Sequence, residues 1–225
     1  MLKKITSIVF LLLLMSAANA FAQEKKTNPP LRQSPAVPEA KAPVAVSYGI
    51  VVDNSGSFRP LLDTVIELVH NIVEENKPDD ETFLVRFVDS AKTSIVQNFT
   101  HSKDAVHTEA DSMFIEGDLT AILDAVNFSA KNLAEKAEKE TNRRRVLILI
   151  TDGEDRSSKA KIEDVLKFLK DEKIQVFTIG LADGKIYGKL LNRLSKETGG
   201  KSFALKTKAE VTTTVKEIAA AMRAQ

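Results

Sequence analysis

Two short apolar runs without any charged residue constrain the fold of this chain more than any other feature of its sequence. They are Val46–Val52 and Val146–Ile150. Runs of this length, made mainly of Val, Ile and Leu, are typical of strands that are buried on both faces of a parallel sheet. Each run ends abruptly in small and polar residues, at 53–57 and 151–155. The sequence therefore predicts a buried sheet with polar loops at the carboxyl ends of two strands.

Helical and strand-like patterns alternate along the rest of the chain. Apolar residues spaced three and four apart indicate helices within 62–73, 122–137, 162–169, 186–194 and 211–222. Further strands are indicated at 83–88, 93–99, 174–179 and 202–205, the first two as a hairpin at a sheet edge. We therefore expect one α/β domain over 44–225, with a single doubly wound, mostly parallel sheet, one antiparallel edge strand and helices on both faces. A capping-box pattern, Thr207 with Glu210, precedes the last helix.

The first 22 residues have the three-part order of a secretory signal peptide. Lys3 and Lys4 precede the apolar run Ile5–Met15, and small residues follow, so cleavage after Ala20 or Ala22 fits the pattern. The apolar run is shorter than the roughly 20 residues that a membrane span needs. We therefore expect an exported protein, periplasmic or secreted, with no membrane span after signal cleavage.

The composition of the chain indicates a linker before the domain and argues against cysteine chemistry and nucleic-acid binding. Residues 23–43 hold five prolines and few large apolar side chains, so we expect a disordered, proline-rich linker there. The chain has no cysteine, which excludes disulfides and thiolate metal sites. Its formal net charge of +1 gives no sign of nucleic-acid binding.

Oxygen-bearing side chains gather in three loops of the expected domain. They are Asp53, Ser55, Ser57, Thr120 and Asp152. Gly56 allows the first loop to turn sharply, so that its carboxylate and two hydroxyls can converge. Ligands of α/β sheets bind at the carboxyl ends of strands, and oxygen donors suit a hard divalent cation such as Mg²⁺. Taken alone, the first loop is equally compatible with simple capping of the next helix.

The three loops together resemble the motifs of the von Willebrand factor type A domain family, which includes integrin I domains. The matching segments, in the family's order, are Asp53-Asn-Ser-Gly-Ser57, Gly117-Asp-Leu-Thr120-Ala-Ile-Leu-Asp124-Ala and Ile150-Thr-Asp152-Gly153. The resemblance covers the chain from about residue 45 to 222. Within the family, the chain looks like the bacterial exported members.

The resemblance implies a metal-ion-dependent adhesion site of the kind found in that family. Ser55, Ser57 and Thr120 would bind Mg²⁺ or Mn²⁺ directly, and Asp53 and Asp152 would bind it directly or through water. An exposed Asp or Glu of a protein partner would complete the coordination of the ion. We therefore expect a metal-dependent protein-binding module of the adhesion type rather than an enzyme.

A hydrolase and a structural domain are the two alternatives to a protein-binding module. A Mg²⁺-dependent hydrolase would need a nucleophile or base, but the chain has no Asp-x-Asp pair, no Walker loop, no Cys and no His near the three loops. A structural domain with a vestigial metal site is the other alternative, and five intact oxygen donors argue against it.

The remaining polar residues near these motifs are expected to have simpler roles. His101 and His107 lack the spacing of a helical metal-binding pair and are interpreted as solvated. Asp118 and Asp124 are interpreted as cap and solvent-exposed residues. Glu154 and Asp155 are expected at the rim of the site.

Overall fold

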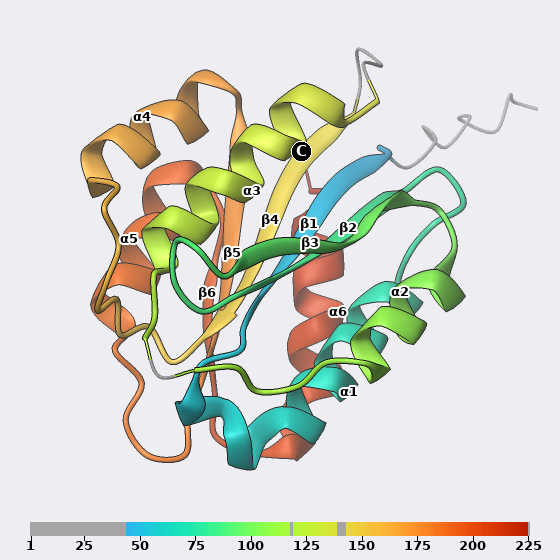
Figure 1. The fold of residues 1–225 in the computed structure, drawn as a ribbon. Helices are drawn as coiled ribbons and strands as arrows, with labels where there is room; N and C mark the ends of the chain where they lie inside the picture. The colour runs from blue at the N-terminus through green and yellow to red at the C-terminus, as the bar shows by residue number, and fades with distance from the viewer. Residues whose placement is uncertain (1–43, 118, 139–142, 225) are drawn as a thin grey trace, which may run out of the picture. The chain divides into compact units, whose positions relative to one another are not determined.

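The computed structural model describes residues 44–117, 119–138 and 143–224. Within them, a six-stranded sheet has the strand order β3-β2-β1-β4-β5-β6 (Figure 1). The strands are β1 (Val46–Asp53), β2 (Glu81–Phe87), β3 (Thr93–Thr100), β4 (Arg144–Thr151), β5 (Ile174–Leu181) and β6 (Ser202–Leu205). β3 pairs with β2 in antiparallel orientation, and all other neighbours in the sheet are parallel. The predicted sheet, with its one antiparallel edge strand, is confirmed. The expected signal peptide and linker at 1–43 lie outside the described residues.

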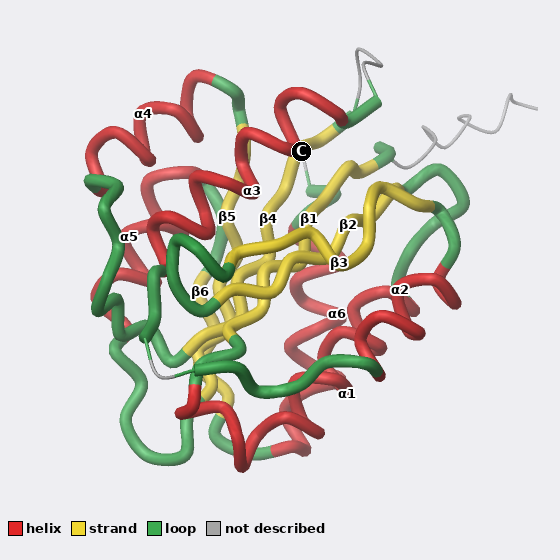
Figure 2. The backbone as a smooth tube through the Cα atoms, viewed as in Figure 1, coloured by secondary structure: helices red, strands yellow, loops and turns green. Residues whose placement is uncertain are grey.

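Helices cover both faces of the sheet. The elements are η1 (Gly56–Leu61), α1 (Leu62–Glu74), α2 (Lys103–Asp111), α3 (Ile122–Lys136), α4 (Ile162–Asp171), α5 (Gly188–Thr198), η2 (Lys208–Glu210) and α6 (Val211–Ala221). α1, α2 and α6 lie on one face, and α3, α4 and α5 lie on the other (Figures 1 and 2). The doubly wound arrangement expected from the sequence is therefore present.

The uncharged character of the central strands follows from this two-sided cover. In β1, the side chains of Ile50 and Val52 belong to the apolar core beneath α1 and α6, whereas Val51 belongs to the core beneath α3 and α4. All eight residues of β1 are buried. Burying each large apolar side chain contributes about 1.5–3 kcal/mol to stability, so a charge in this strand would be costly on either face.

Gly49 in the middle of β1 has a packing role. A Cβ atom at this position would lie 2.2 Å from the ring of Phe83 on the neighbouring strand. The absence of a side chain therefore lets the Phe83 ring lie directly against β1.

The predicted capping box at the last helix is wrong. The hydroxyl of Thr207 makes no capping hydrogen bond, and the Glu210 carboxylate instead accepts the backbone N–H of Lys206 at 2.8 Å. The physical reason is the short 3₁₀ helix η2, which places Glu210 before α6 rather than within its first turn.

The interpretation of His107 as a solvated residue is also wrong. Its ring stacks against His70 of α1, with centroids 4.4 Å apart. The Nε2 atom of His107 lies 3.5 Å from a carboxylate oxygen of Glu74, and that of His70 lies 3.1 Å from Asp111. The pair therefore helps to pack α2 on α1, a contact between residues too far apart in sequence for helical spacing to reveal.

Candidate functional site

Asp53 is the buried centre of the candidate site. It is the last residue of β1 and is 1% exposed. Its Oδ1 atom accepts the backbone N–H of Ser55 at 2.9 Å, and its Oδ2 atom accepts the hydroxyl of Thr151 at 2.7 Å. Because β1 and β4 are adjacent and in parallel register, the two strand ends meet at the same edge of the sheet. Asp53 thus joins the first and third loops predicted from the sequence.

The two serines of the first loop lie together, as expected. Their Oγ atoms are 3.0 Å apart. Ser55 is buried, whereas Ser57 is exposed, because the chain turns into η1 at Gly56. The loop therefore carries one hydroxyl on a buried residue, Ser55, and one on an exposed residue, Ser57.

Thr120 is brought to this edge of the sheet by its own backbone. Its carbonyl oxygen accepts the N–H groups of Arg156 and Ser157, at 2.8 and 3.0 Å, from the loop after β4. The next residue, Ala121, donates its N–H to the carbonyl of Val88, just beyond the end of β2, at 2.8 Å. Thr120 is 3% exposed, and its hydroxyl forms no hydrogen bond with any other described residue. This hydroxyl is therefore available to a ligand at the site.

Asp152 is held by a turn that only glycine fits well. Its Oδ1 atom accepts the N–H of Glu154 at 2.9 Å, and its carbonyl accepts the N–H of Tyr187 at 2.7 Å. Gly153 has a φ of +86°, and a Cβ there would lie 2.5 Å from the Tyr187 carbonyl oxygen. The glycine of the third motif thus allows the loop after β4 to pass close to the segment before α5.

The electrostatics of the site favour a cation. Burial raises the pKa of Asp53 from 3.8 to about 6, although the hydrogen bonds from Thr151 and Ser55 oppose this rise, and repulsion from Asp152 adds to it. Neither Asp53 nor Asp152 forms an ion pair with a described Lys, Arg or His side chain, and Arg156, whose charge interacts with Asp152, is exposed and pairs with Glu154. Two buried polar atoms in the same loops, Oδ1 of Asn54 and Oγ of Ser157, have no hydrogen-bond partner in the described part of the chain.

The donor set fits a hard cation rather than a soft one. Every candidate side chain offers oxygen, which suits Mg²⁺ or Mn²⁺. Among the described residues, no cluster of three or more His, Cys, Asp or Glu side chains could hold a metal. A cation here would therefore depend on the three hydroxyls as well as on the two carboxylates.

Two residues that contribute to the site were missed by the sequence analysis. Thr151 is one, although a hydroxyl at the last position of an otherwise apolar strand was a usable signal. Asp124 is the other, since it is more than a cap or solvent-exposed residue. Its carboxylate accepts the N–H groups of Lys159 and Ala160 at 2.7–3.1 Å and the hydroxyl of Ser90. It therefore fastens the loop after β4 to α3 and to the hairpin between β2 and β3.

Of the two residues expected at the rim of the site, Glu154 forms an ion pair with Arg156, and both of these side chains are partly exposed. The other, Asp155, accepts the N–H of Ser158 at 3.3 Å through its Oδ1 atom. Asp118 lies outside the described residues.

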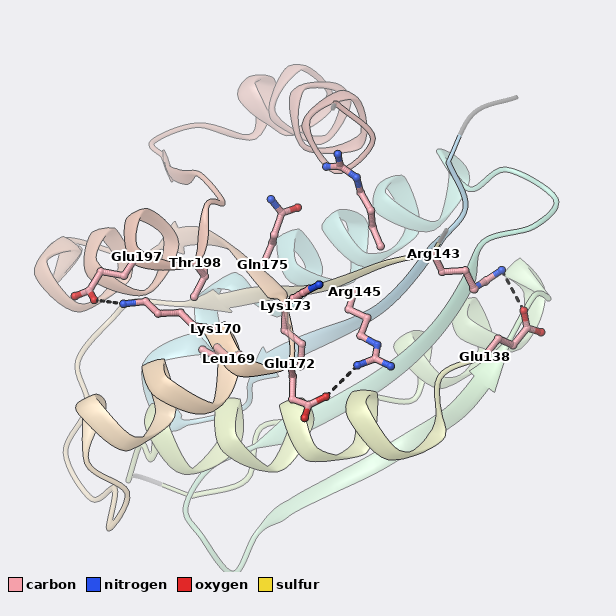
Figure 3. Close-up of a pocket in the computed structure, with 12 residues that line it drawn as sticks. Glu138, Arg143, Arg145, Leu169, Lys170, Glu172, Lys173, Gln175, Glu197 and Thr198 are labelled. Carbon is pink, nitrogen blue, oxygen red and sulfur yellow. Dashed lines mark hydrogen bonds and ion pairs between the residues drawn. The ribbon is translucent and has the colours of Figure 1, made fainter. Parts of the chain in front are cut away.

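A cavity of about 660 Å³ lies at the other end of β4 and β5 (Figure 3). Its cationic side chains are largely paired, as in Arg145–Glu172 at 3.0 Å and Lys170–Glu197 at 2.7 Å. The cavity is also lined by Lys170 in the last turn of α4 and by Lys173 just beyond it, where basic side chains compensate the helix dipole. We therefore interpret this basic cluster as structural and place the functional site at the carboxyl ends of the strands.

The described part of the chain contains no helix that is both long and apolar enough to cross a membrane.

Residues 49–218 match the family model of the von Willebrand factor type A domain. No curated protein sequence gives a significant match.

Several solved structures share the fold. An aerotolerance-related membrane protein from Bacteroides fragilis superposes with a TM-score of 0.66 at 18% identity, covering 79% of this chain and 98% of that one. The conserved hypothetical protein BatB from Bacteroides thetaiotaomicron gives 0.65 at 18% identity, covering 80% and 100%. A von Willebrand factor type A protein from Catenulispora acidiphila gives 0.66 at 16% identity, covering 80% and 43%.

Proposed function

This chain belongs to the von Willebrand factor type A domain family, whose members often mediate protein interactions, and we propose that it is an exported, non-enzymatic module that binds a protein partner through a divalent cation. The observation that carries the proposal is the meeting of three separate loops at one sheet edge. These loops supply the five oxygen-bearing side chains Asp53, Ser55, Ser57, Thr120 and Asp152.

Each of these side chains has a part in the proposed binding. The hydroxyls of Ser55, Ser57 and Thr120 are neutral ligands, and the carboxylates of Asp53 and Asp152 would hold the ion directly or through water. When bound, Mg²⁺ or Mn²⁺ would supply an electrophilic position for a carboxylate oxygen of the partner. Since neutral hydroxyls do little to reduce the charge at the site, an exposed Asp or Glu is the partner group that it favours.

Catalysis is not part of the proposal, because the usual nucleophiles and bases are placed elsewhere or missing. The chain has no cysteine. His70 and His107 stack on each other between α1 and α2, and His101 contacts the carbonyl of Asp80 before β2. A hydrolase would need such a group within hydrogen-bonding reach of its substrate.

A pull-down from envelope and extracellular extracts tests the binding function. The mature protein should capture a partner in Mg²⁺ and release it in EDTA. Asp53→Ala should capture nothing above background, whereas Glu135→Gln, which changes an exposed acidic residue near the end of α3, should behave like the wild type. Equal capture by wild type and Asp53→Ala would refute the proposal.

The proposed export has a separate test. It rests on the order of Lys3 and Lys4, an apolar run and small residues in the sequence. The mature protein in the periplasmic or secreted fraction should begin at Phe21 or Gln23. Recovery of the protein only in the cytoplasm, with Met1 intact, would contradict it.

A further inference from the structure

We infer that the partner carries an apolar side chain beside its acidic residue, and that this side chain packs on Phe114 and Leu119. The inference rests on the proposed function and specifies the chemistry of the partner. Phe114 is 52% exposed and Leu119 is 50% exposed. Among the described residues, Phe128 is the one other exposed large hydrophobic side chain, at 38%. Single exposed apolar residues are common, but two of three in one short segment call for an explanation.

The segment that carries both side chains is attached to the candidate site at each end. The carbonyl of Phe114 accepts the side-chain amide of Asn54 at 2.7 Å, and Asn54 lies between Asp53 and Ser55 in the chain. The N–H of Glu116 donates to the carbonyl of the same Asn54 at 2.9 Å. Leu119 directly precedes Thr120. A partner whose carboxylate reaches the site therefore places its neighbouring residues over this segment.

The Phe114 ring is held in place while it remains half exposed. The guanidinium carbon of Arg86 lies 4.6 Å from the ring centroid. Glu116 in turn lies 3.8 Å from Arg86 and 3.6 Å from Lys92. Because the ring and its support are already ordered, covering the ring with a partner costs little further conformational entropy.

The other side of the site has a different character. There, the described loop after β4 and the described segment before α5 carry no exposed large hydrophobic side chain, and Arg156 pairs with Glu154. The apolar contact is thus available on one side of the partner's acidic residue and not on both. This asymmetry predicts a recognition sequence in which a large apolar residue lies to one side of Asp or Glu.

Selection from a phage-displayed library of random peptides tests the inference without knowledge of the natural partner. The immobilised mature protein is loaded in Mn²⁺, and bound phage are eluted with EDTA. The eluted sequences should share an Asp or Glu with Leu, Ile, Met or Phe nearby, on a consistent side. A synthetic peptide with the consensus sequence is then titrated into the protein variants in Mn²⁺.

Leu119→Gln and Phe114→Gln should each weaken binding of that peptide about tenfold, the effect of losing part of one buried apolar contact. Phe128→Gln, a matched control on α3, should leave the affinity unchanged. Binding of Mn²⁺ alone, measured by calorimetry, should be the same in all three variants and in wild type.

The outcomes separate this inference from the proposed function. EDTA-eluted peptides that share an acidic residue but no apolar neighbour would overturn the inference and leave the proposed function intact. Unchanged peptide affinity in both Leu119→Gln and Phe114→Gln would also overturn the inference and leave the proposed function intact. A failure to bind Mn²⁺, or to yield any EDTA-eluted peptide, would overturn both.

Discussion

The hydroxyl of Thr151 donates a hydrogen bond of 2.7 Å to Oδ2 of Asp53 and joins the ends of β4 and β1. The two residues are 98 positions apart in the sequence, and neither is more than 1% exposed. The Asp53 carboxylate, which we propose as a metal ligand, is therefore also a buried acceptor within the fold. Its role in stability and its role in binding can be separated by experiment.

Replacing Thr151 with Val tests the structural role of this bond. The variant keeps the shape of the side chain but leaves Oδ2 of Asp53 without its donor. We expect a loss of about 1–3 kcal/mol in the free energy of unfolding at neutral pH, the usual cost of an unsatisfied buried group. Urea denaturation without metal measures it, and Thr151→Ser, which keeps the hydroxyl, should lose much less. Equal losses in the two variants would show that the hydroxyl is not what matters.

The raised pKa of Asp53 predicts how the stability of the metal-free protein changes with pH. Burial raises this pKa from 3.8 to about 6, so the folded state holds the proton more tightly than the unfolded state. The stabilisation is therefore fully present below the unfolded-state value and is lost as the pH rises through about 6. The shift corresponds to about 3 kcal/mol.

Asp53→Asn isolates this contribution, because the amide does not titrate. In EDTA, the stability of the variant relative to wild type should increase by about 2–3 kcal/mol between about pH 4 and pH 7.5. Urea denaturation of both proteins across this range is the measurement. A difference that stays constant with pH would contradict the raised pKa.

Gly153→Ala should destabilise the loop that carries Asp152. The backbone at position 153 has a φ of +86°, which a residue with a side chain rarely adopts. The new Cβ would also lie 2.5 Å from the carbonyl oxygen of Tyr187, so the loop must shift. We expect a loss of about 1–3 kcal/mol in thermal or urea unfolding. Gly188→Ala, where a Cβ would meet Asn192 at an ordinary 3.5 Å, should be neutral or stabilising. A neutral Gly153→Ala would show that the turn accommodates a side chain.

Asp124→Ala should loosen the loop after β4, because it removes the acceptor for Lys159, Ala160 and Ser90. Burial opposes the charge of Asp124, but the hydrogen bonds from Ser90, Lys159 and Ala160 outweigh it and lower the pKa. The stabilisation is therefore present above the unfolded-state pKa of 3.8 and is lost as the pH falls through the folded-state value.

Amide hydrogen exchange at Lys159 and Ala160 measures this effect directly. Exchange should be faster in Asp124→Ala than in wild type at neutral pH, and the difference should shrink on strong acidification. Unchanged protection of both amides at neutral pH would show that Asp124 does not hold the loop.

The fold was predictable from the sequence because its strongest signals are local. In a charge-free run such as Val146–Ile150, apolar side chains point to both faces of the strand, so both faces must be covered. The alternation of such strands with helices then indicates a doubly wound sheet. The three oxygen-rich loops were predictable for the same reason, since each directly follows a buried strand or precedes a helix.

The contacts within the site were not predictable, because they depend on register and on loop paths. The bond between Thr151 and Asp53 requires knowing that β1 and β4 are neighbours with their ends level. The role of Asp124 depends on the path of a loop about 35 residues further along the chain. The exposure of Phe114 and Leu119 likewise follows from how the segment between α2 and α3 is attached to Asn54.

Calorimetric titration of Mn²⁺ and Mg²⁺ into wild type, Asp53→Ala and Glu135→Gln tests the central claim most directly. The account predicts that wild type binds one ion per chain, that Asp53→Ala binds none while it remains folded, and that Glu135→Gln binds like wild type. The fold should persist in Asp53→Ala because the apolar residues of β1 remain buried. Failure of wild type to bind either ion, or equal binding by Asp53→Ala, would contradict the account.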